Sequence, residues 1–388
     1  YQEFYQQLTL DFEEPLTHTH LVVDAPVQLY SILYIPAKPE RNVFSLRKED
    51  GLKLYARKVL IQEYNKDLLP EYLGFVQGVV DTEDLPLNVS RESVQANRVI
   101  AQLKKLVTNK TLDMLKRLAK DEPEKYQQFW QSYDRYIKQG VAIEQNEPET
   151  LYPLLRFRTT AHPDQWSSLD DYVQRMKPDQ TQIYYIMGDD EHSVLYSPHL
   201  DVVRHYDYEV LLFTDPVDAF MLVRLDKYQD HPLVNVANAD LKLPAGKEQD
   251  GETQPKGLAE AEQNTLIERF KHQLGDKVTD VRITERLNDS PARLIDPEGA
   301  PNHEMQRVYR LLNREFETPK KILELNPRHP ILLRLNSLEV EHPLNQVIIE
   351  QIYEDALLIE GLHPDPASMI SRIQKLMEAA VDANKAGA

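Results

Sequence analysis

The chain has 388 residues, enough for two or three domains, and carries 63 acidic against 45 basic side chains, a formal net charge of −18 at pH 7. This charge argues against nucleic acid and membranes as partners, because nucleic acid and anionic lipid carry charge of the same sign. The absence of cysteine excludes disulfides, thiol catalysis and cysteine-bound metals.

The first segment alternates helix and strand signals. Tyr1, Phe4, Tyr5 and Leu8 share one helical face, with no capping residue in front of them. The runs LYSILYIP and KLYARKVLI are rich in β-branched, aromatic and apolar residues, a pattern that predicts two strands. With the helix that follows, this pattern predicts a large α/β layer domain over residues 1–120.

That helix is predicted from Ser90 to about Lys120. Ser90 is a natural N-cap, and apolar residues repeat behind it at helical spacing. Arg91 lies in the first turn, where the helix dipole disfavours a cation by roughly 0.3–1 kcal/mol, so an anion is expected nearby. The anion is either a bound phosphate or one of the local carboxylates Asp81, Glu83, Asp84 and Glu92.

A helical spacer is predicted over residues 121–167. Aromatic and apolar side chains recur at helical spacing, and Gly140 stands where a glycine would end the helix. The stripe favours a buried helix face over a ligand platform, because no glycine-rich loop accompanies it. It consists of Tyr126, Phe129, Trp130, Tyr133 and Ile137.

A smaller α/β unit is predicted over residues 168–243. Ser168 begins a helix, and the apolar runs 182–188 and 208–215 are typical of buried parallel strands joined by a crossover helix near 199–205. The acidic turn from Gly188 to His192 raises the question of a metal, but neighbouring acids in a loop point in different directions. His18 and His20 lack a third ligand, so no metal site is predicted.

A linker rich in proline and glycine follows at residues 244–257, and a mixed α/β domain is predicted over 258–388. Its first helix carries Leu266, Phe270 and Leu274. A later amphipathic segment places Met305, Val308 and Tyr309 on one face, which either packs on its own domain or is free for a partner.

The last two predicted helices indicate a dimer. Both carry more apolar residues than one helix pair can cover, and the same pair from a second copy would complete a four-helix bundle. The alternative is packing onto residues 258–335 of the same chain. The residues expected at the dimer interface are Val347, Ile352, Ile370, Ile373, Leu376 and Met377.

Several of these segments resemble one family. The stretch GVVDTEDLPLNVSRESVQANRVIAQLKKLV (78–107) is similar to the middle segment of the ninety-kilodalton heat-shock chaperones, most closely their bacterial high-temperature protein G branch. The resemblance covers nearly the whole chain apart from the acidic linker and the last few residues. It continues through residues 4–20, 29–38, 51–61, 118–130, 168–186, 197–218 and 322–330.

The resemblance implies a role for Arg91 and Gln95. In the family this arginine reaches the γ-phosphate of ATP, bound with magnesium in a separate N-terminal domain, and the glutamine assists. That domain has no counterpart in this sequence, so the chain is expected to be part of a longer protein. We expect it to bind no cofactor and hydrolyse no ATP alone, although the full-length protein would be an ATP hydrolase.

The resemblance also implies binding partners and a cellular location. Unfolded or partly folded client proteins would contact Phe220, together with Met305, Val308 and Tyr309, while the family's acidic residue before Phe220 is replaced by Ala219. The family dimerises through its C-terminal helices, and co-chaperones of the seventy-kilodalton heat-shock system are expected. We therefore expect a cytoplasmic, stress-response chaperone. The alternatives are a nucleotide-independent binding scaffold and a metal hydrolase at Asp189.

Overall fold

The computed structural model describes residues 1–39, 51–85, 94–238, 241, 243, 257–297 and 320–386, without the side chains of 94–97 and 383–386. The chain divides into two compact units. The first comprises Tyr1–Arg156 with Ser168–Asp170 and Phe220–Leu225, and the second comprises Phe157–Ser167, Asp171–Ala219 and Asp226–Ala388. The predicted linker lies outside the described residues except for Gly257, and the domain boundaries placed around it stay predictions.

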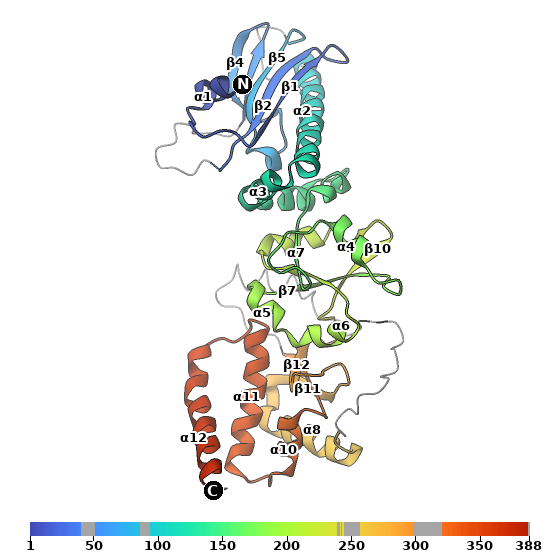
Figure 1. Ribbon diagram of the computed structural model, residues 1–388, viewed down its shortest axis with the longest axis vertical. Helices are drawn as coiled ribbons and strands as arrows, with labels where there is room; N and C mark the ends of the chain where they lie inside the picture. Colours follow the sequence, from blue (N-terminus) through green and yellow to red (C-terminus); the bar gives the residue numbers. More distant parts are fainter. Residues whose placement is uncertain are drawn as a thin grey trace. The chain divides into compact units, whose positions relative to one another are not determined.

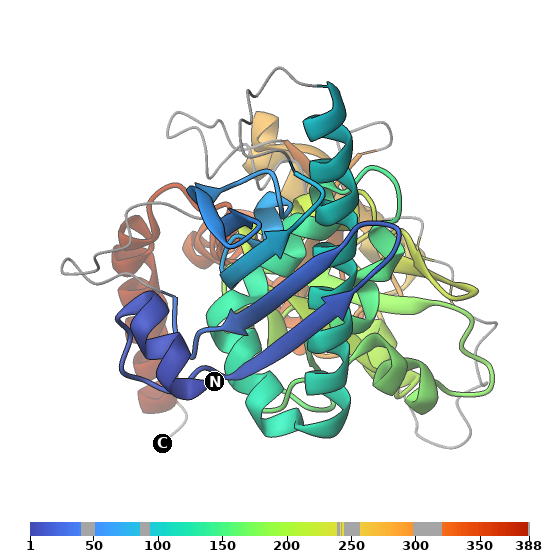
Figure 2. The ribbon, with the colours of Figure 1, turned by 90° about the horizontal axis from the view of Figure 1, so that it is seen from above.

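The first unit is built on a sheet in the order β1-β2-β5-β3-β4, in which only β3 and β5 run parallel. Leu29, Leu33 and Ile35 alternate along β2 and are fully buried, as expected for a strand with one face in a core. Figures 1 and 2 show the β1–β2 hairpin lying along α2. The elements are α1 (Gln2–Thr9), β1 (Thr17–Val23), β2 (Leu29–Ile35), β3 (Leu52–Ala56), β4 (Val59–Asn65), η1 (Glu71–Leu73) and β5 (Gln77–Thr82).

The run KLYARKVLI forms two strands, so the expectation of a single strand was wrong. Ala56 pairs with Val59, and the two residues between them, Arg57 and Lys58, have φ values of 52° and 66°. Positive φ at both positions is the geometry of a tight hairpin turn, usually signalled by Asn-Gly. Arginine and lysine carry no such signal, which is why the turn escaped the sequence pattern.

Two long helices complete the first unit, α2 (Val94–Asp121) and α3 (Pro123–Ile143), followed by η2 (Pro148–Thr150) and η3 (Tyr152–Leu154). The predicted aromatic stripe of α3 is buried. Gly140, however, does not end the helix. A Cβ there would lie 2.8 Å from the Tyr72 ring and 3.0 Å from Leu151, so the glycine allows these side chains to pack closely against the helix.

The second unit begins with a sheet in the order β6-β8-β7-β10-β9. Strands β7, β8 and β10 are parallel neighbours, which confirms the predicted βαβ arrangement. The elements from β6 to β10 are β6 (Arg158–Thr159), α4 (Leu169–Arg175), β7 (Ile183–Met187), α5 (Glu191–Leu195), η4 (Pro198–Leu200), α6 (Asp201–His205), β8 (Val210–Phe213), α7 (Pro216–Leu222), β9 (Lys227–Tyr228) and β10 (His231–Asn235). The start of α4 and the end of α7 belong to the first unit.

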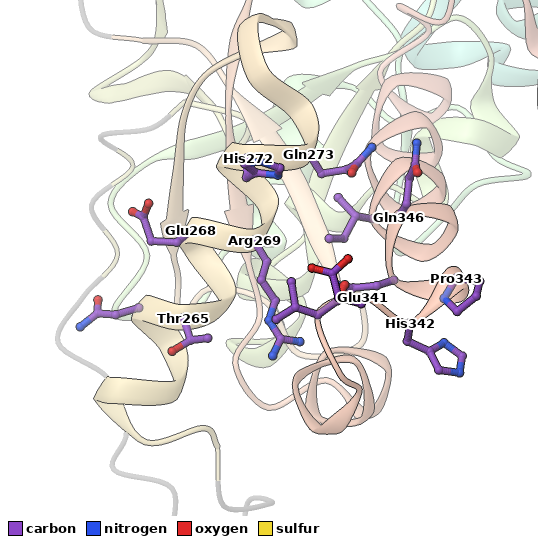
Figure 3. Close-up of a pocket in the computed structure, with 13 residues that line it drawn as sticks. Thr265, Glu268, Arg269, His272, Gln273, Glu341, His342, Pro343 and Gln346 are labelled. Atoms are coloured by element: carbon purple, nitrogen blue, oxygen red, sulfur yellow. The ribbon is translucent and has the colours of Figure 1, made fainter.

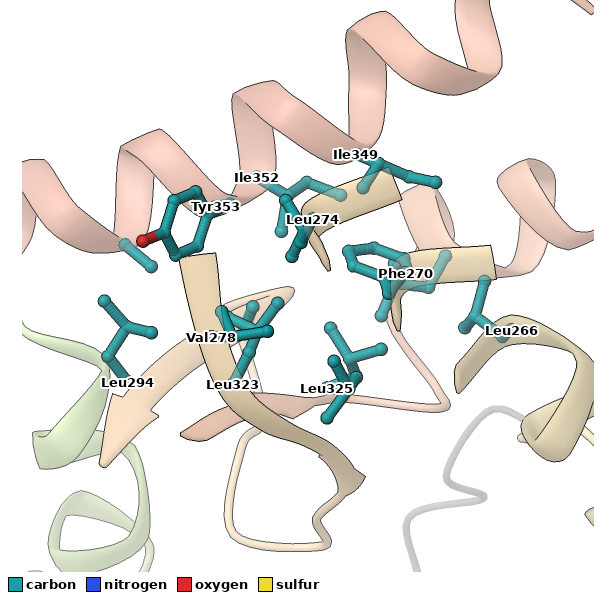
Figure 4. Packing of buried hydrophobic residues seen from close by; sticks show 14 of the residues in the cluster. Leu266, Phe270, Leu274, Val278, Leu294, Leu323, Leu325, Ile349, Ile352 and Tyr353 are labelled. Atoms are coloured by element: carbon teal, nitrogen blue, oxygen red, sulfur yellow. The ribbon is translucent and has the colours of Figure 1, made fainter. Parts of the chain in front are cut away.

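The C-terminal part of this unit packs helices on a sheet in the order β11-β13-β12. Phe270 of α8, Leu323 of β13 and Ile352 of α11 meet in one core (Figure 4). The elements are α8 (Glu260–Leu274), η5 (Gly275–Lys277), β11 (Val278–Ile283), β12 (Ala292–Ile295), β13 (Lys321–Leu325), α10 (Pro330–Ser337), α11 (Pro343–Ile359), η6 (Pro366–Met369) and α12 (Ile370–Ala386).

The sheets, each with both parallel and antiparallel strand pairs, and the helices that cover them confirm the predicted α/β class. Within the described ranges, none of the helices combines the length and the apolar character needed to cross a membrane.

Candidate functional site

The residues expected to contact ATP precede or begin α2. Arg91 lies outside the described residues, and of Gln95 only the backbone, in the first turn of α2, is described. The chain approaches them from β5, and its first residues after that strand are held in place. The Asp84 carboxylate accepts a hydrogen bond from the Gln28 backbone N–H at 2.7 Å, so residues 82–85 are tied to the start of β2.

Two of the acidic residues near Arg91 in the sequence accept hydrogen bonds from backbone N–H groups elsewhere in the first unit. Asp81 Oδ1 accepts from the Lys58 backbone N–H at 3.1 Å and thereby supports the β3–β4 turn. The Asp84 carboxylate is engaged with Gln28. Two of the four carboxylates considered as local partners for Arg91 therefore each accept a backbone hydrogen bond, and the anion near Arg91 stays a prediction.

The expected client-binding residue lies on α7. The Phe220 side chain is 42% exposed, whereas the preceding Ala219 is 1% exposed and belongs to the interior. Val223, one turn after Phe220, is 64% exposed, so two apolar side chains reach solvent from one short segment. The second set of expected client residues, Met305, Val308 and Tyr309, lies outside the described residues.

This segment is firmly anchored. Leu225 is fully buried, and the Arg224 carbonyl accepts from the Tyr152 hydroxyl at 3.0 Å. An exposed aromatic side chain on a fixed backbone loses little conformational freedom when a partner covers it, which is the property of an interface anchor.

The residues expected at a dimer interface fall into two groups. On α12, Ile370, Ile373 and Met377 are 56%, 39% and 63% exposed, and Val381 continues the same face. On α11, Val347 is half-buried, and Ile352 is buried in the core of its own chain. Leu376 of α12 is half-buried. The single-chain packing considered as the alternative therefore accounts for Ile352, but not for the open face of α12.

Ionic contacts that no sequence pattern indicated join α12 to α11. The Arg372 guanidinium makes two hydrogen bonds to the Glu354 carboxylate, at 2.6 and 3.0 Å. Burial alone would raise the pKa of Glu354, but hydrogen bonds from Arg372 and His363 outweigh it and hold the pKa below its usual value. The two partners are 18 residues apart and belong to different helices, so helical spacing cannot reveal them.

A cavity of about 700 Å³ lies between α8 and the start of α11 (Figure 3). Arg269, His272 and Gln273 line it from α8, and Glu341, His342 and Gln346 line it from the loop and first turn of α11. The Arg269 guanidinium donates to the carbonyls of Leu335 and Leu338, at 3.2 and 3.0 Å. This arginine therefore holds the end of α10 in place.

The residues considered for a metal have other roles. Asp190 of the acidic turn accepts from the Ser193 N–H at 2.9 Å and caps α5. His20 Nδ1 lies 2.9 Å from the Tyr1 hydroxyl. In the part of the chain that the structure covers, no three His, Asp or Glu side chains are grouped so that they could hold a metal ion.

Comparison with known proteins agrees with the motifs. The family model described as Hsp90 protein matches residues 1–388. The chain is 40% identical over 396 residues to the chaperone protein HtpG of Nitratidesulfovibrio vulgaris, covering 100% of this chain and 62% of that relative. The HtpG of Desulfitobacterium hafniense is 38% identical over 384 residues, and the match covers 98% of this chain and 62% of the relative.

A third relative, the HtpG of Ruthia magnifica, is 36% identical over 382 residues, covering 97% of this chain and 60% of the relative. The chain thus spans about three fifths of the length of these relatives. The matches extend over the exposed segment at Phe220 and both C-terminal helices, so they confirm the resemblance seen in the motifs. The chain belongs to the Hsp90 protein family.

Proposed function

We propose that this chain is the client-binding and dimerising part of an ATP-driven molecular chaperone. Family membership supports the proposal, and the single structural observation that carries it is the exposure of Phe220 on a fixed segment. A chaperone needs apolar surface that remains open in the folded protein, because its clients are recognised by the apolar side chains that their own folding would bury.

The client surface is centred on Phe220 and Val223. The acidic client contact of the family is lost here, since Ala219 is both uncharged and buried. Binding would therefore rely on apolar contact, with the aromatic ring as the anchor. A non-native client segment with an aliphatic or aromatic residue is the partner that this surface suits.

Phe220→Ala tests this surface. We expect the affinity for an unfolded model client to fall by about 1–2 kcal/mol, roughly 5- to 30-fold in Kd, while the thermal unfolding midpoint changes little. The measurement is fluorescence anisotropy of a labelled, permanently unfolded client. Tyr196→Ala is the matched control, because it removes another exposed aromatic ring outside the surface. Equal affinities for the wild type and Phe220→Ala would remove Phe220 from the site.

The open face of α12 supports the dimer. Two copies that bury Ile370, Ile373, Met377 and Val381 against each other would remove apolar surface from water at about 25 cal/mol per Å². A symmetric interface uses the same surface on both copies, so each exposed residue contributes twice. Chaperone action by two linked copies also gives each client two attachment sites.

We further propose that Arg91 contacts the γ-phosphate of ATP bound in the remainder of the full-length protein, with Gln95 assisting. The chemistry fits, because an arginine beside the free N–H groups of a helix start suits a phosphoryl oxygen. ATP with magnesium would supply the phosphoryl group to be transferred. The role of this chain would be to place one positive charge where negative charge develops.

Arg91→Ala in the full-length protein tests this assignment. We expect kcat for ATP hydrolysis to fall roughly 10-fold or more with ATP affinity nearly unchanged, since such an arginine acts mainly on the transition state. Gln95→Ala should lower kcat less. Steady-state turnover and equilibrium ATP binding are measured on the same samples. Unchanged turnover in a folded Arg91→Ala protein would remove Arg91 from the site.

A further inference from the structure

Three histidine–proline pairs in the C-terminal part share one hydrogen-bond pattern. In each, the histidine Nδ1 accepts from the backbone N–H two residues later, across a proline that has no N–H of its own. His329 accepts from Ile331 at 3.2 Å, His342 from Leu344 at 3.2 Å, and His363 from Asp365 at 3.1 Å. The pairs lie in separate segments, so the pattern arises three times independently.

Two of these histidines are helix N-caps. His329 and His342 directly precede α10 and α11, with extended backbone angles (φ −68°, ψ 131° and φ −63°, ψ 130°) typical of that position. Each ring nitrogen satisfies an N–H that the helix itself leaves without a partner. Figure 3 shows His342 and Pro343 at the start of α11.

Imidazole makes an unusual cap because protonation removes its acceptor. The neutral ring has one nitrogen with a lone pair and one N–H, and here the lone pair lies on Nδ1. A second proton turns Nδ1 into a donor that faces another donor. The resulting cation also lies at the positive end of the helix dipole. Protonation therefore weakens a histidine cap in two ways, by removing the acceptor and by placing a cation at the helix start. An asparagine cap is unaffected by pH in this range.

The surroundings differ among the three. Burial lowers the pKa of His329. A hydrogen bond to the Asp289 backbone and the Asp289 charge oppose this shift without cancelling it. Arg328 is the neighbour of His329 in sequence. At His342 the charged neighbours are Glu341 beside it and, across the cavity, Glu268, Arg269 and His272 of α8.

His363 lies among more charges. Its Nε2 is 3.3 Å from Glu354 Oε2, and Asp365 follows two residues later. Asp355 and Arg372 complete the charged groups around it. His363 thus has an acidic partner at Nε2, and Asp365, not His363, caps the helix that follows. His363 is therefore excluded from the device proposed next.

We propose that His329 and His342 act as acid-sensitive caps that loosen the first turns of α10 and α11 together when the pH falls. Below these turns lie Leu332 and Leu335 of α10 and Ile349 of α11, all buried in one core. Acid would thus open this edge of the core. At His329, where burial lowers the pKa, the sign follows from linkage: the unfolded histidine binds the proton more readily, so the stabilisation is fully present above a pH of about 6.5 and is lost as the pH falls through the lower pKa of the folded state.

The double variant His329→Asn/His342→Asn tests the proposal. Asparagine is a strong N-cap that does not titrate in this range. Thermal unfolding of the whole 388-residue chain is followed at pH 7.5 and 5.5. On acidification the Tm of the wild type should fall further than that of the double variant, by about 2–4 °C for each cap. If the Tm of both proteins fell by the same amount between pH 7.5 and 5.5, the proposal would be overturned.

A control variant and a direct measurement of the capped amides complete the test. His205→Asn replaces an exposed histidine that does not cap a helix, and should keep the wild-type pH profile. Protection factors from amide hydrogen exchange report the Ile331 and Leu344 N–H groups directly. In the wild type they should fall about 5-fold or more between pH 7.5 and 5.5, and in the double variant they should stay level. Constant wild-type protection at these amides would contradict the proposal even if the variant folds poorly.

Discussion

Helices α3 and α12 carry the same kind of apolar stripe, but only the stripe of α3 is covered. Phe129 of α3 is fully buried, with its ring 5.5 Å from Phe75 and 5.4 Å from Tyr133. On α12 the corresponding residues Ile373 and Met377 are 39% and 63% exposed. Helical spacing therefore predicts that a face is apolar, and neighbours from elsewhere in the chain decide whether it is buried.

The two helices are also held differently. The stripe of α3 is packed against side chains distant in sequence, including Tyr72 and Phe75. Helix α12 is held to α11 on another of its sides by the Arg372–Glu354 contact. An ionic attachment leaves the apolar face of α12 free, and this is what a surface for a second copy requires. Three substitutions can break or sharpen this contrast.

The largest effect is expected for Ile373→Asp. An unpaired carboxylate at the dimer interface costs several kcal/mol and is felt in both copies, so the dimer dissociation constant should rise about 1000-fold or more. The chain should become a monomer that keeps its circular dichroism. Light scattering at micromolar concentration measures the mass. Ser371→Asp adds the same charge on the polar side of α12 and should leave the dimer intact. A monomeric wild type would show that the open face is not a dimer interface.

Phe129→Ala should come next. Removing a fully buried aromatic ring typically costs about 3–5 kcal/mol, from lost burial and the cavity left behind. Urea unfolding followed by tryptophan fluorescence measures the loss. Gln128→Ala, at an exposed position of the same helix, should change stability by less than about 0.5 kcal/mol. If the two variants were equally stable, the core assigned to α3 would be wrong.

A smaller effect is expected for Arg372→Gln. The half-buried Glu354 carboxylate would lose its two charge-assisted hydrogen bonds, at a cost of about 1–3 kcal/mol to the attachment of α12. Because the pKa of Glu354 lies below its usual value in the folded protein, this contribution is present at neutral pH and disappears as the pH falls through the acidic range. The variant should therefore lose less stability in acid than the wild type.

Hydrogen exchange along α12 measures this attachment. Lys375→Gln removes the same charge from an exposed position of α12 and serves as the control. Exchange in α12 should be faster in Arg372→Gln than in Lys375→Gln. Equal exchange in the two variants would show that apolar contacts alone hold the helix.

Many elements could be predicted from local patterns. The buried strands at 183–187 and 210–213 and the helix after Ser168 formed as expected, because a run of apolar residues or a capping residue acts within a few positions. The turn at Arg57–Lys58 and the position of Gly140 inside α3 were missed. In the first the usual turn residues are absent, and in the second the reason is the distant Tyr72 ring.

The candidate site divides in the same way. The family resemblance predicts Phe220 as a client contact, and only the fold shows that it is exposed while its neighbour Ala219 is buried. Ile352 was expected at a dimer interface and instead lies in the core of its own chain, in the same buried cluster as Phe270 and Leu323. Burial depends on which surfaces meet, and that information is distributed over the whole chain.

By itself, the sequence determined the class of fold, the family and the apolar faces of the helices, since composition, motifs and periodicity are local properties. The tertiary structure decided which apolar faces are covered, which charges meet and which histidines cap helices. Arg372 and Glu354 are separated by a helix end, a turn and a helix start, and their 2.6 Å contact exists only because α12 folds back on α11. Contacts of this kind depend on the path of the chain between the partners, which no short pattern specifies.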